Sequence, residues 1–481
     1  MTIQIFTPEI SVILKKTTSR DQSGKSERYT AGAKEFDLKP FLTEDSAITM
    51  SRQINAPAGT FQISVDDRGV THDRTLDSLY GIAEPMDVIE IRMARSPHEY
   101  QGKLPLVFRG VITEVRRDES MSQDGKPNRT VILAGHDWGK FLQIIQERYI
   151  RGNPLSEAWL SGLVMQIHYD IKYGVYPAGE VITQMVQKIG NKFIGDYGLP
   201  DIIPPFLIDV SGADPSDMVM PQGYQAFPDG TLWGFLQTYG DVGPFYELFL
   251  DDTEAGPKLI YRKPPFFTAD GDMIHGTLPE SVNIDPSQVQ RLSVSRSDAD
   301  VANWVWINMR RISLISERNA ILMSMAENPG ASFMDYPNCR RELYGIRTMT
   351  VETNHGFMFQ GAPKEQKAID ETNMANYREK KTRQIRLSNM DNSVFETGSM
   401  TIAGNEKVKI GTNVRIQRGR TISLYYAQSV THSFRPFKSF TTTVQFIRGT
   451  GFVNRSSNDQ LGIKAPYLEE IGHGPYESTK A

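Results

Sequence analysis

One stretch, 391–451, constrains the fold of this chain more than any other. Apolar and polar residues alternate there in short runs, most clearly over 408–416. Glycines at Gly404, Gly411 and Gly419 separate the runs. A period of two predicts β-strands, and glycines between the runs predict tight turns. The stretch therefore predicts a small antiparallel barrel or a strongly bent sheet.

The two longest runs in this stretch predict a hairpin. They cover 424–433 and 439–448, on either side of the turn 435–438. Strict alternation places Tyr426, Gln428, Val430 and His432 on one face of the first run, and Tyr425, Ala427, Ser429 and Thr431 on the other. Because neither face is uniformly apolar, we expect a barrel wall with neighbours on both sides. Val430 and His432 are candidate interface residues.

An earlier stretch, 87–142, has the same pattern. Its strand-like runs are 88–93, 107–116 and 129–135. Arg109 and Gly110 lie inside the middle run, where a glycine predicts a bend or bulge of the kind found at barrel corners. Arg109 is a third candidate interface residue. Two units with one pattern suggest an internal duplication, although their sequences share little identity.

Changes of period divide the chain into four parts. Residues 1–140 predict a first β-barrel, and 141–285 predict a mixed α/β insertion. Residues 286–455 predict a second barrel that includes a long amphipathic helix over 363–389. The polar tail 456–481 need not pack by itself. The predicted fold class is mainly β with an α+β insertion, built on two similar small β-barrel domains.

Smaller elements are predicted from the same periodicities. Helices are expected at 156–167, 178–188 and 231–239, strands at 246–250, 258–262, 289–295, 301–309 and 344–351, and a Pro- and Gly-rich loop at 196–228. Trp304 and Trp306 lie on one face of a predicted strand. That placement favours core packing or contact between subunits over a ligand platform, and both are candidate interface residues.

Composition excludes several classes of protein. A net charge of -4 lacks the basic footprint that specific or nonspecific nucleic-acid binding needs. The single cysteine, Cys339, excludes an internal disulfide and a cysteine-rich zinc site. No apolar run approaches the roughly 20 residues that span a bilayer, so no stable membrane association is expected. The N-terminus lacks the apolar core of a secretory signal, which predicts synthesis in a cytoplasm.

Sequence signatures of catalysis do not occur. The eight histidines are never at metal-ligand spacing such as HExxH. The phosphate-binding loop with a trailing Lys-Ser/Thr and the GxSxG elbow are both missing from the sequence. The sequence therefore predicts no catalytic residue, no cofactor and no metal site.

Several segments together resemble the baseplate hub proteins of contractile-tailed phages. That family includes the late control D proteins and is related to the N-terminal part of type VI secretion spike proteins. The segments are 107–115, 131–142, 293–307, 344–353, 395–416 and 425–449. The pair 395–416 and 425–449 is the most specific, because a glycine-punctuated barrel closes on a Val-Thr-His-Ser run and a Thr-rich return strand.

The resemblance implies a homotrimer in which three chains with two barrels each form a ring of pseudo-sixfold symmetry. One face of the ring would continue the hexameric tail tube, and the other would hold a trimeric central spike, here a separate chain. The implied role is structural, within the virion, after synthesis in the bacterial host cytoplasm. Neighbouring baseplate proteins and tape-measure proteins are further expected partners. The insertion 141–285 is expected outside the ring, away from its lumen.

Two other functions are kept as alternatives. A baseplate-associated peptidoglycan-degrading enzyme, housed in 141–285, would need two carboxylates at a fixed separation in a deep cleft. A monomeric carbohydrate-binding barrel would present an exposed aromatic platform and would not self-associate.

Overall fold

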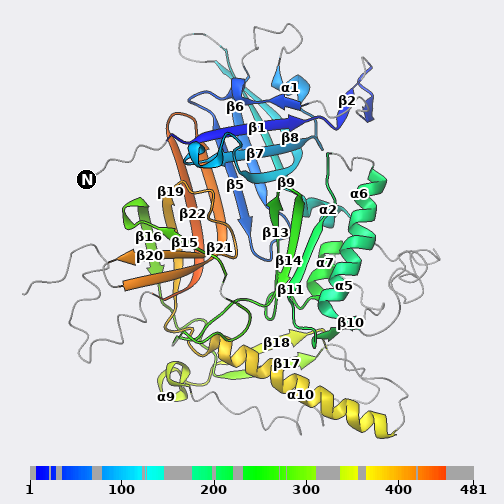
Figure 1. The fold of residues 1–481 in the computed structure, drawn as a ribbon, viewed down its shortest axis with the longest axis vertical. Coiled ribbons are helices and arrows are strands. Elements are labelled where there is room, and N and C mark those ends of the chain that lie inside the picture. Colours follow the sequence, from blue (N-terminus) through cyan, green and yellow to red (C-terminus); the bar gives the residue numbers. More distant parts are fainter. Residues whose placement is uncertain are drawn as a thin grey trace, which may run out of the picture.

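The structure is a computed structural model of the whole chain. It describes residues 7–20, 23–28, 35–67, 78–121, 125, 127–145, 176–197, 202–219, 231–269, 271–277, 279–309, 336–355, 364–418 and 421–450. The helix expected at 156–167 and the tail 456–481 lie outside the described residues. The fold is mainly β with an α+β insertion, as the sequence predicts (Figure 1).

The first strand unit wraps six strands around one apolar core. The strands are β1 (Glu9–Lys15), β5 (Ala47–Gln53), β6 (Thr60–Asp66), β7 (Val88–Ala94), β8 (Leu106–Met121) and β9 (Pro127–Asp137). Their order in the sheet is β5-β6-β9-β8-β7-β1, all antiparallel, and the short strand β4 (Glu35–Asp37) follows β1. Alternate residues such as Ile48, Ile63 and Leu133 fill the core, because successive side chains of a strand point to opposite faces.

The second strand unit repeats this arrangement. Its strands are β15 (Ser281–Ile284), β16 (Val289–Ser295), β19 (Glu396–Ala403), β20 (Asn413–Arg418), β21 (Thr421–Arg435) and β22 (Ser439–Gly449). Their order is β16-β19-β22-β21-β20-β15. Each strand of the first unit has a counterpart in the second: β1 corresponds to β15, β5 to β16, β6 to β19, β7 to β20, β8 to β21 and β9 to β22. With these correspondences, the two units have the same chain order and the same sheet order. One difference is that β15 pairs with β20 in parallel.

The long hairpins of the two units carry a β-bulge at the same place. In β8 the register against β9 shifts between Ile112 and Glu114. In β21 the register against β22 shifts between Ala427 and Ser429. A bulge inserts one residue into one strand and reverses the faces of the residues beyond it. The shared bulge supports the internal duplication that the sequence pattern suggests.

The bulge makes strict alternation along β21 wrong. Tyr425 and Ala427 lie in the same core cluster as Val430, although alternation places them on opposite faces. The extra residue Gln428 is the reason. Tyr426 lies in this cluster too, and its hydroxyl also reaches the insertion, where it donates a hydrogen bond to Glu247 Oε2 at 2.6 Å.

The sequence predicts a bend or a bulge at Gly110, and the structure has no bulge at this residue. The register of β8 against β9 shifts at Thr113, three residues later. The glycine is required because strands approach closely: a Cβ at Gly110 would lie 2.3 Å from the carbonyl oxygen of His136.

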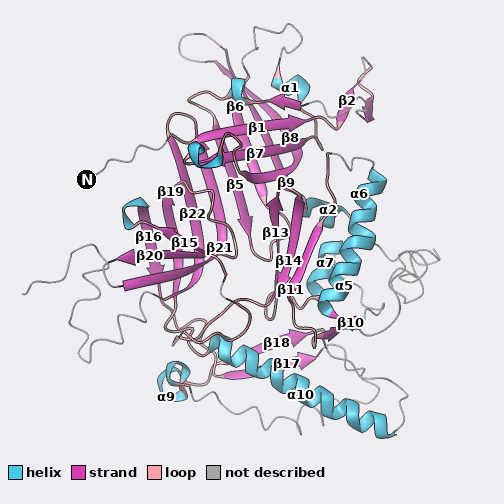
Figure 2. Ribbon diagram, in the orientation of Figure 1, coloured by secondary structure: helices cyan, strands magenta, loops and turns pink. Residues whose placement is uncertain are grey.

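The insertion is a helical layer on a three-stranded sheet. The sheet order is β11-β14-β13, with β11 (Leu207–Gly212), β13 (Glu247–Thr253) and β14 (Gly256–Arg262). The helices are α2 (Gly139–Ile144), α5 (Ala178–Met185), the π-helical turn η3 (Val186–Gly190), α6 (Asn191–Tyr197) and α7 (Leu232–Tyr239). Figure 2 shows these helices on one side of the sheet. The sequence predicts 196–228 as a loop with little regular structure, and β11 corrects this. Periodicity misses this strand because its partner β14 is distant in sequence.

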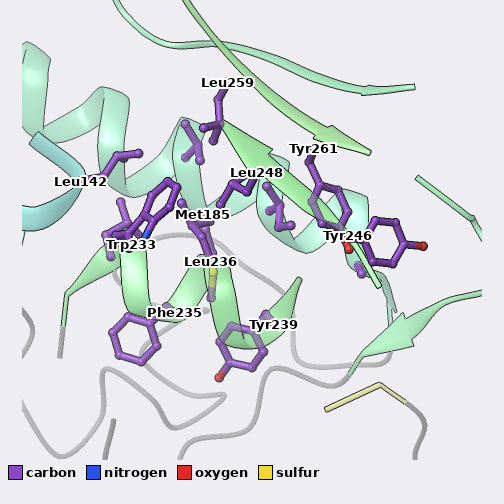
Figure 3. Close-up of a cluster of buried hydrophobic side chains, with 14 of the residues drawn as sticks. Leu142, Met185, Trp233, Phe235, Leu236, Tyr239, Tyr246, Leu248, Leu259 and Tyr261 are labelled. Atoms are coloured by element: carbon purple, nitrogen blue, oxygen red, sulfur yellow. The ribbon is translucent and has the colours of Figure 1, made fainter. Parts of the chain in front are cut away.

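The β13–β14 hairpin has two apolar faces. Leu248 and Leu259 point into the insertion core beside Trp233 and Leu236 of α7 (Figure 3). Phe249, between them in register, belongs to the core of the second strand unit. A period of two thus lets one hairpin bury apolar side chains against both parts of the molecule.

Two further strands and a long helix pack against the insertion. β17 (Trp304–Met309) pairs in parallel with β18 (Thr348–Thr353), and α10 (Lys364–Asn389) is close to the helix expected at 363–389. The strand expected from residue 344 starts later, because α9 (Arg341–Tyr344) ends at Gly345, whose φ of 69° breaks the extended backbone. Short elements are β2 (Thr18–Arg20), β3 (Ser26–Arg28), η1 (Lys39–Phe41), α1 (Leu79–Ile82), η2 (Pro97–Tyr100), β10 (Tyr176–Pro177), β12 (Met218–Val219), η4 (Pro286–Gln288) and η5 (Pro337–Cys339).

Candidate functional site: the joint between the strand units

The two strand units are joined edge to edge into one 13-stranded sheet. Residues 429–434 of β21 pair antiparallel with residues 48–53 of β5, from Ser429 opposite Gln53 to Phe434 opposite Ile48. Ser51 Oγ and Thr431 Oγ1 lie 2.9 Å apart across this pairing. Beyond the bulge, Phe434 and Phe440 of the hairpin pack in the core of the first unit. The hairpin therefore belongs to both units.

His432 and Val430 lie inside this joint. Val430 is 4% exposed and packs in the core of the second unit. His432 is 7% exposed, and its Nδ1 lies 3.0 Å from Thr442 Oγ1. Burial lowers the pKa of His432 to about 4, with a smaller contribution from the charge of Arg52. Its imidazole is neutral near pH 7 and has a packing role in the joint.

Arg52 ties the joint to the insertion. Its guanidinium pairs with Asp252 of β13 through Nη2 and with Asp137 at the end of β9 through Nε, at 3.3 Å. The guanidinium also lies 4.5 Å from the ring centroid of Phe108. Burial raises the pKa of Asp252, and the charge of Arg52 opposes that shift. Because the pair is buried in the protein, removing either side chain would leave the other charge buried without this partner.

Arg109 stands beside this ion pair. Its backbone nitrogen donates a hydrogen bond to Asp252 Oδ2 at 2.7 Å, and its Nη2 lies 3.3 Å from Glu90 Oε2. Both Arg109 and Glu90 are buried. Three of the candidate residues, Arg109, Val430 and His432, thus gather where the two units and the insertion meet. All three are covered by the chain itself.

Further polar contacts hold the insertion between the units. Arg262 of β14 donates to the carbonyl oxygen of Gly411 at 2.8 Å and to the hydroxyl of Tyr426 at 2.9 Å. Asn55, just after β5, accepts a hydrogen bond from the backbone nitrogen of Leu248 at 2.9 Å and donates its own backbone N–H to the Leu248 carbonyl at 3.0 Å. The three parts are therefore joined by charges and backbone hydrogen bonds as well as apolar packing.

The joint contains a small, partly open pocket of about 30 Å³, which has room for a water molecule and not for a saccharide. Two carboxylates line it, and both are engaged. Asp251 binds Lys409 Nζ at 2.9 Å. Glu406 accepts hydrogen bonds from the Arg95 backbone nitrogen at 3.0 Å and from the Tyr100 hydroxyl at 2.7 Å. The space beside this carboxylate pair is too small for the sugar ring that glycoside hydrolysis must place between two carboxyl groups.

Trp304 and Trp306 are elsewhere, on β17. Both are partly buried, and the guanidinium of Arg378 on α10 lies 5.8 Å from the Trp306 ring centroid. The flanking residues Val305 and Ile307 point into the insertion core. The structure therefore separates the two tryptophans from the other candidate residues.

Sequence reasoning missed a second buried polar cluster, which fixes α10 to the insertion. Lys381 Nζ donates a hydrogen bond to Asp217 Oδ2 at 2.7 Å, and neither side chain is exposed. Tyr246 donates to the same oxygen at 2.5 Å. The ammonium group lies 4.4 Å from the Phe245 ring centroid. Burial lowers the pKa of Lys381, and the charge of Asp217 opposes this.

A buried pair of a histidine and an aspartate, His355 and Asp241, lies beside that cluster. His355 Nε2 lies 2.7 Å from the Tyr239 carbonyl oxygen, and its Nδ1 lies 3.3 Å from Asp241 Oδ2. Burial lowers the pKa of His355. Nothing in the sequence pattern marks this cluster, because Lys381 lies in a helix rich in solvated charges.

Among the described residues, no group of three or more His, Cys, Asp or Glu side chains is placed to hold a metal ion. Within the same residues, no helix is both long enough and apolar enough to cross a bilayer.

Comparison with known proteins gives matches to solved structures. No family model matches the chain, and no curated protein matches its sequence. The chain is similar to a tail protein from Neisseria meningitidis MC58, with 11% identity and a TM-score of 0.46, over 93% of this chain and 98% of that one. It is also similar to the 43 kDa tail protein of prophage MuSo2 from Shewanella oneidensis, with 11% identity and a TM-score of 0.46, over 92% of this chain and 97% of that one.

A third similar structure is an E. coli component of the type VI secretion system. It has 8% identity and a TM-score of 0.36, and the match covers 85% of this chain and 73% of that one. These matches belong to the groups that the sequence resemblance indicates, phage tail proteins and type VI secretion components. The likeness is one of fold.

Proposed function

We propose that this protein is a structural hub of a phage tail baseplate, a homotrimer that adapts the sixfold tail tube to the threefold central spike. The observation that carries the proposal is the internal duplication. Each chain holds two strand units with the same chain order, sheet order and bulge position, joined in one sheet. Three such chains in a closed ring present six similar units, while the chain itself is repeated three times.

The parts of the chain that occur once suit the threefold partner. Among the elements that the structure describes, the insertion and the β17–β18–α10 region each occur once, whereas the strand unit occurs twice. In a trimer, each of them would appear three times around the axis. Features that occur twice per chain would serve the tube, and features that occur once would serve the spike.

The joint is suited to carrying force. Its backbone hydrogen bonds connect the units as neighbouring strands are connected, and the Arg52–Asp252 pair fastens the insertion across it. A symmetry adaptor performs no reaction, and the carboxylates at the joint are occupied by Lys, Arg or Tyr partners. We therefore propose a mechanical role in the virion, next to tube, spike and other baseplate proteins.

We also propose that the insertion lies outside the ring. Helices α5 and α7 cover the face of β13 and β14 that points away from the second unit. A wall of strands leaves little space in a lumen, whereas this helical layer can pack around the periphery. A reconstruction of the assembled baseplate in which α5 and α7 face the channel would contradict this placement.

The test of the proposed function is the mass in solution. Light scattering is expected to give three times the chain mass of 54.2 kDa, alone or after addition of the tube and spike proteins. A monomer at micromolar concentration that neither partner converts to a trimer would overturn the proposal.

A further inference from the structure

We infer that the outer half of β8 in one copy pairs with β16 of the next copy, reproducing between chains the joint that β21 and β5 form within one chain. This inference rests on the proposed trimer and names the strands that would close it. Its premise is the strand correspondence of the two units, in which β8 corresponds to β21 and β16 corresponds to β5.

Within the part of the chain that the structure describes, both strands have an edge without a neighbouring strand. β8 pairs with β7 only as far as Val111, and beyond the bulge most residues of 114–121 are exposed. β16 pairs with β19 and with no other described strand. Val294 on β16 is 42% exposed. An apolar side chain on an open edge strand is a liability in a monomer, and pairing with another strand removes it.

The corresponding strands show what covers such an edge. β21 pairs with β20 only as far as Tyr426, and beyond its own bulge it pairs with β5. Each chain therefore makes this joint once, with β21 and β5. Within the described residues, the outer half of β8 and the side of β16 away from β19 have no strand beside them. Within one chain β8 and β16 are separated by six strands in the sheet order. A second copy is the occupant that carries the matching strand.

The two open edges are different surfaces, so the contact between copies is head to tail. A head-to-tail contact closes into a ring when the rotation per copy divides a full turn. The β21–β5 joint sets the rotation between units within a chain. Repetition of one rotation at both kinds of joint is what a pseudo-sixfold ring of three chains requires.

The equivalence also predicts a register. The bulges place Glu114 of β8 at the position of Ser429, and the pairings through β6 and β19 place Val294 of β16 at the position of Met50. His432 is opposite Met50 in the joint within the chain. Arg117 takes the place of His432, so we expect Arg117 of one copy opposite Val294 of the next.

The remaining positions give a polar joint with one charge pair. Asp118 falls opposite Ser293, which puts Asp118 diagonal to Arg291 on the same face of the sheet. Diagonal neighbours on a sheet face are within reach of long side chains, and opposite charges there are stabilising. At the positions that the buried His432 and Phe434 occupy in the joint within the chain, β8 has charged residues. Such an edge stays soluble before assembly.

Disulfide cross-linking tests the register. In the full chain with Arg117→Cys and Val294→Cys, opposite residues would have Cβ atoms about 5 Å apart, close enough for a disulfide after small adjustments. Mild oxidation is expected to give covalent dimers and trimers on non-reducing gels. Arg117→Cys with Ser293→Cys shifts the register by one residue and is the matched control, with at least fivefold less product expected. Each single variant controls for Cys339, which is buried.

The outcomes separate this inference from the proposed function. A trimer by light scattering without cross-linking above the single variants would overturn the inference and leave the proposed function standing. Covalent dimers from Val294→Cys alone would also overturn it, because they would mean that β16 pairs with itself. A protein that stays monomeric with tube and spike proteins, and does not cross-link, would overturn both.

Discussion

Arg52 and Asp252 form an ion pair inside the protein, between β5 of the first strand unit and β13 of the insertion, 200 residues apart in sequence. The same carboxylate accepts the backbone N–H of Arg109. One side chain of the insertion thus contacts two strands of the first unit at the point where the second unit joins. The position of the insertion is coupled to the joint through this residue.

Replacing Asp252 with Ala is expected to destabilise the chain by about 3–5 kcal/mol, because it removes one of the two carboxylates that pair with the buried Arg52. Chemical denaturation of the purified protein measures the change. Asp298→Ala is the matched control, since it removes an exposed pair with Arg347 and should cost at most about 1 kcal/mol. Equal costs for the two variants would contradict the importance of the buried pair.

Val430→Asp is expected to abolish the trimer. The side chain is packed in the core of the second unit, and an unpaired carboxylate there costs several kcal/mol, roughly the value for an unsatisfied buried polar group or more. Size-exclusion chromatography with light scattering measures assembly, and infectivity of complemented phage measures spike attachment.

His432→Ala separates the structural role from catalysis. Loss of a general base would abolish a reaction without disturbing assembly, whereas the packing role predicts a moderate loss of stability. If Val430→Asp still gave infectious tails while His432→Ala assembled normally and abolished infection, the protein would belong to another functional class.

Acid is expected to destabilise the joint through His432. Its pKa is about 4 in the folded protein against 6.5 for the ordinary group, so the unfolded chain binds a proton between these pH values and the folded chain does not. Stability from the neutral histidine is complete above pH 6.5 and is lost as pH falls toward 4. The change is at most about 3 kcal/mol. Urea denaturation of wild type and His432→Gln at pH 7 and 4.5 should show a smaller pH effect in the variant.

Lys381→Met is expected to loosen α10. The substitution leaves the buried Asp217 with Tyr246 as its remaining hydrogen-bond donor, at a cost of about 3–5 kcal/mol. Amide hydrogen exchange should show lost protection around residue 381. Adding Asp217→Asn removes the uncompensated charge while keeping an acceptor for Tyr246, so the double variant should recover most of the loss. A double variant as unstable as Lys381→Met would contradict the ion-pair account.

Local patterns predicted the strand runs and the long helix, because alternation and helical periodicity follow from which side of an element is buried. They predicted neither the bulge at Gln428 nor β11, which depends on pairing with β14. Local patterns could not predict the joint between the two units either, since Ser51 and Thr431 are 380 residues apart. The pattern named Val430, His432 and Arg109 as candidates. It could not show that they lie where the two units meet the insertion, because no periodicity connects the insertion to them.

Gly398→Ala tests whether β16 takes part in assembly. Gly398 of β19 lies opposite Val294, and a Cβ at Gly398 would be 1.9 Å from the carbonyl oxygen of Ser293. A contact that short to backbone cannot be relieved by a side-chain rotation, so β16 must shift away from β19. Because β16 is at the end of the strand order, the shift need not disturb the core. We expect a folded chain, by circular dichroism, that no longer forms a trimer.

The matched control is Gly195→Ala in α6, where a Cβ meets no atom within 4 Å. Alanine is the better helix former, so this variant should be as stable as wild type or up to about 1 kcal/mol more stable. It should also assemble normally. If Gly398→Ala is folded and trimeric, with the mass and sedimentation of wild type, then β16 is not the strand through which copies meet. Loss of the trimer in Gly398→Ala alone, with the helix variant unaffected, assigns the assembly contact to the edge that β16 forms.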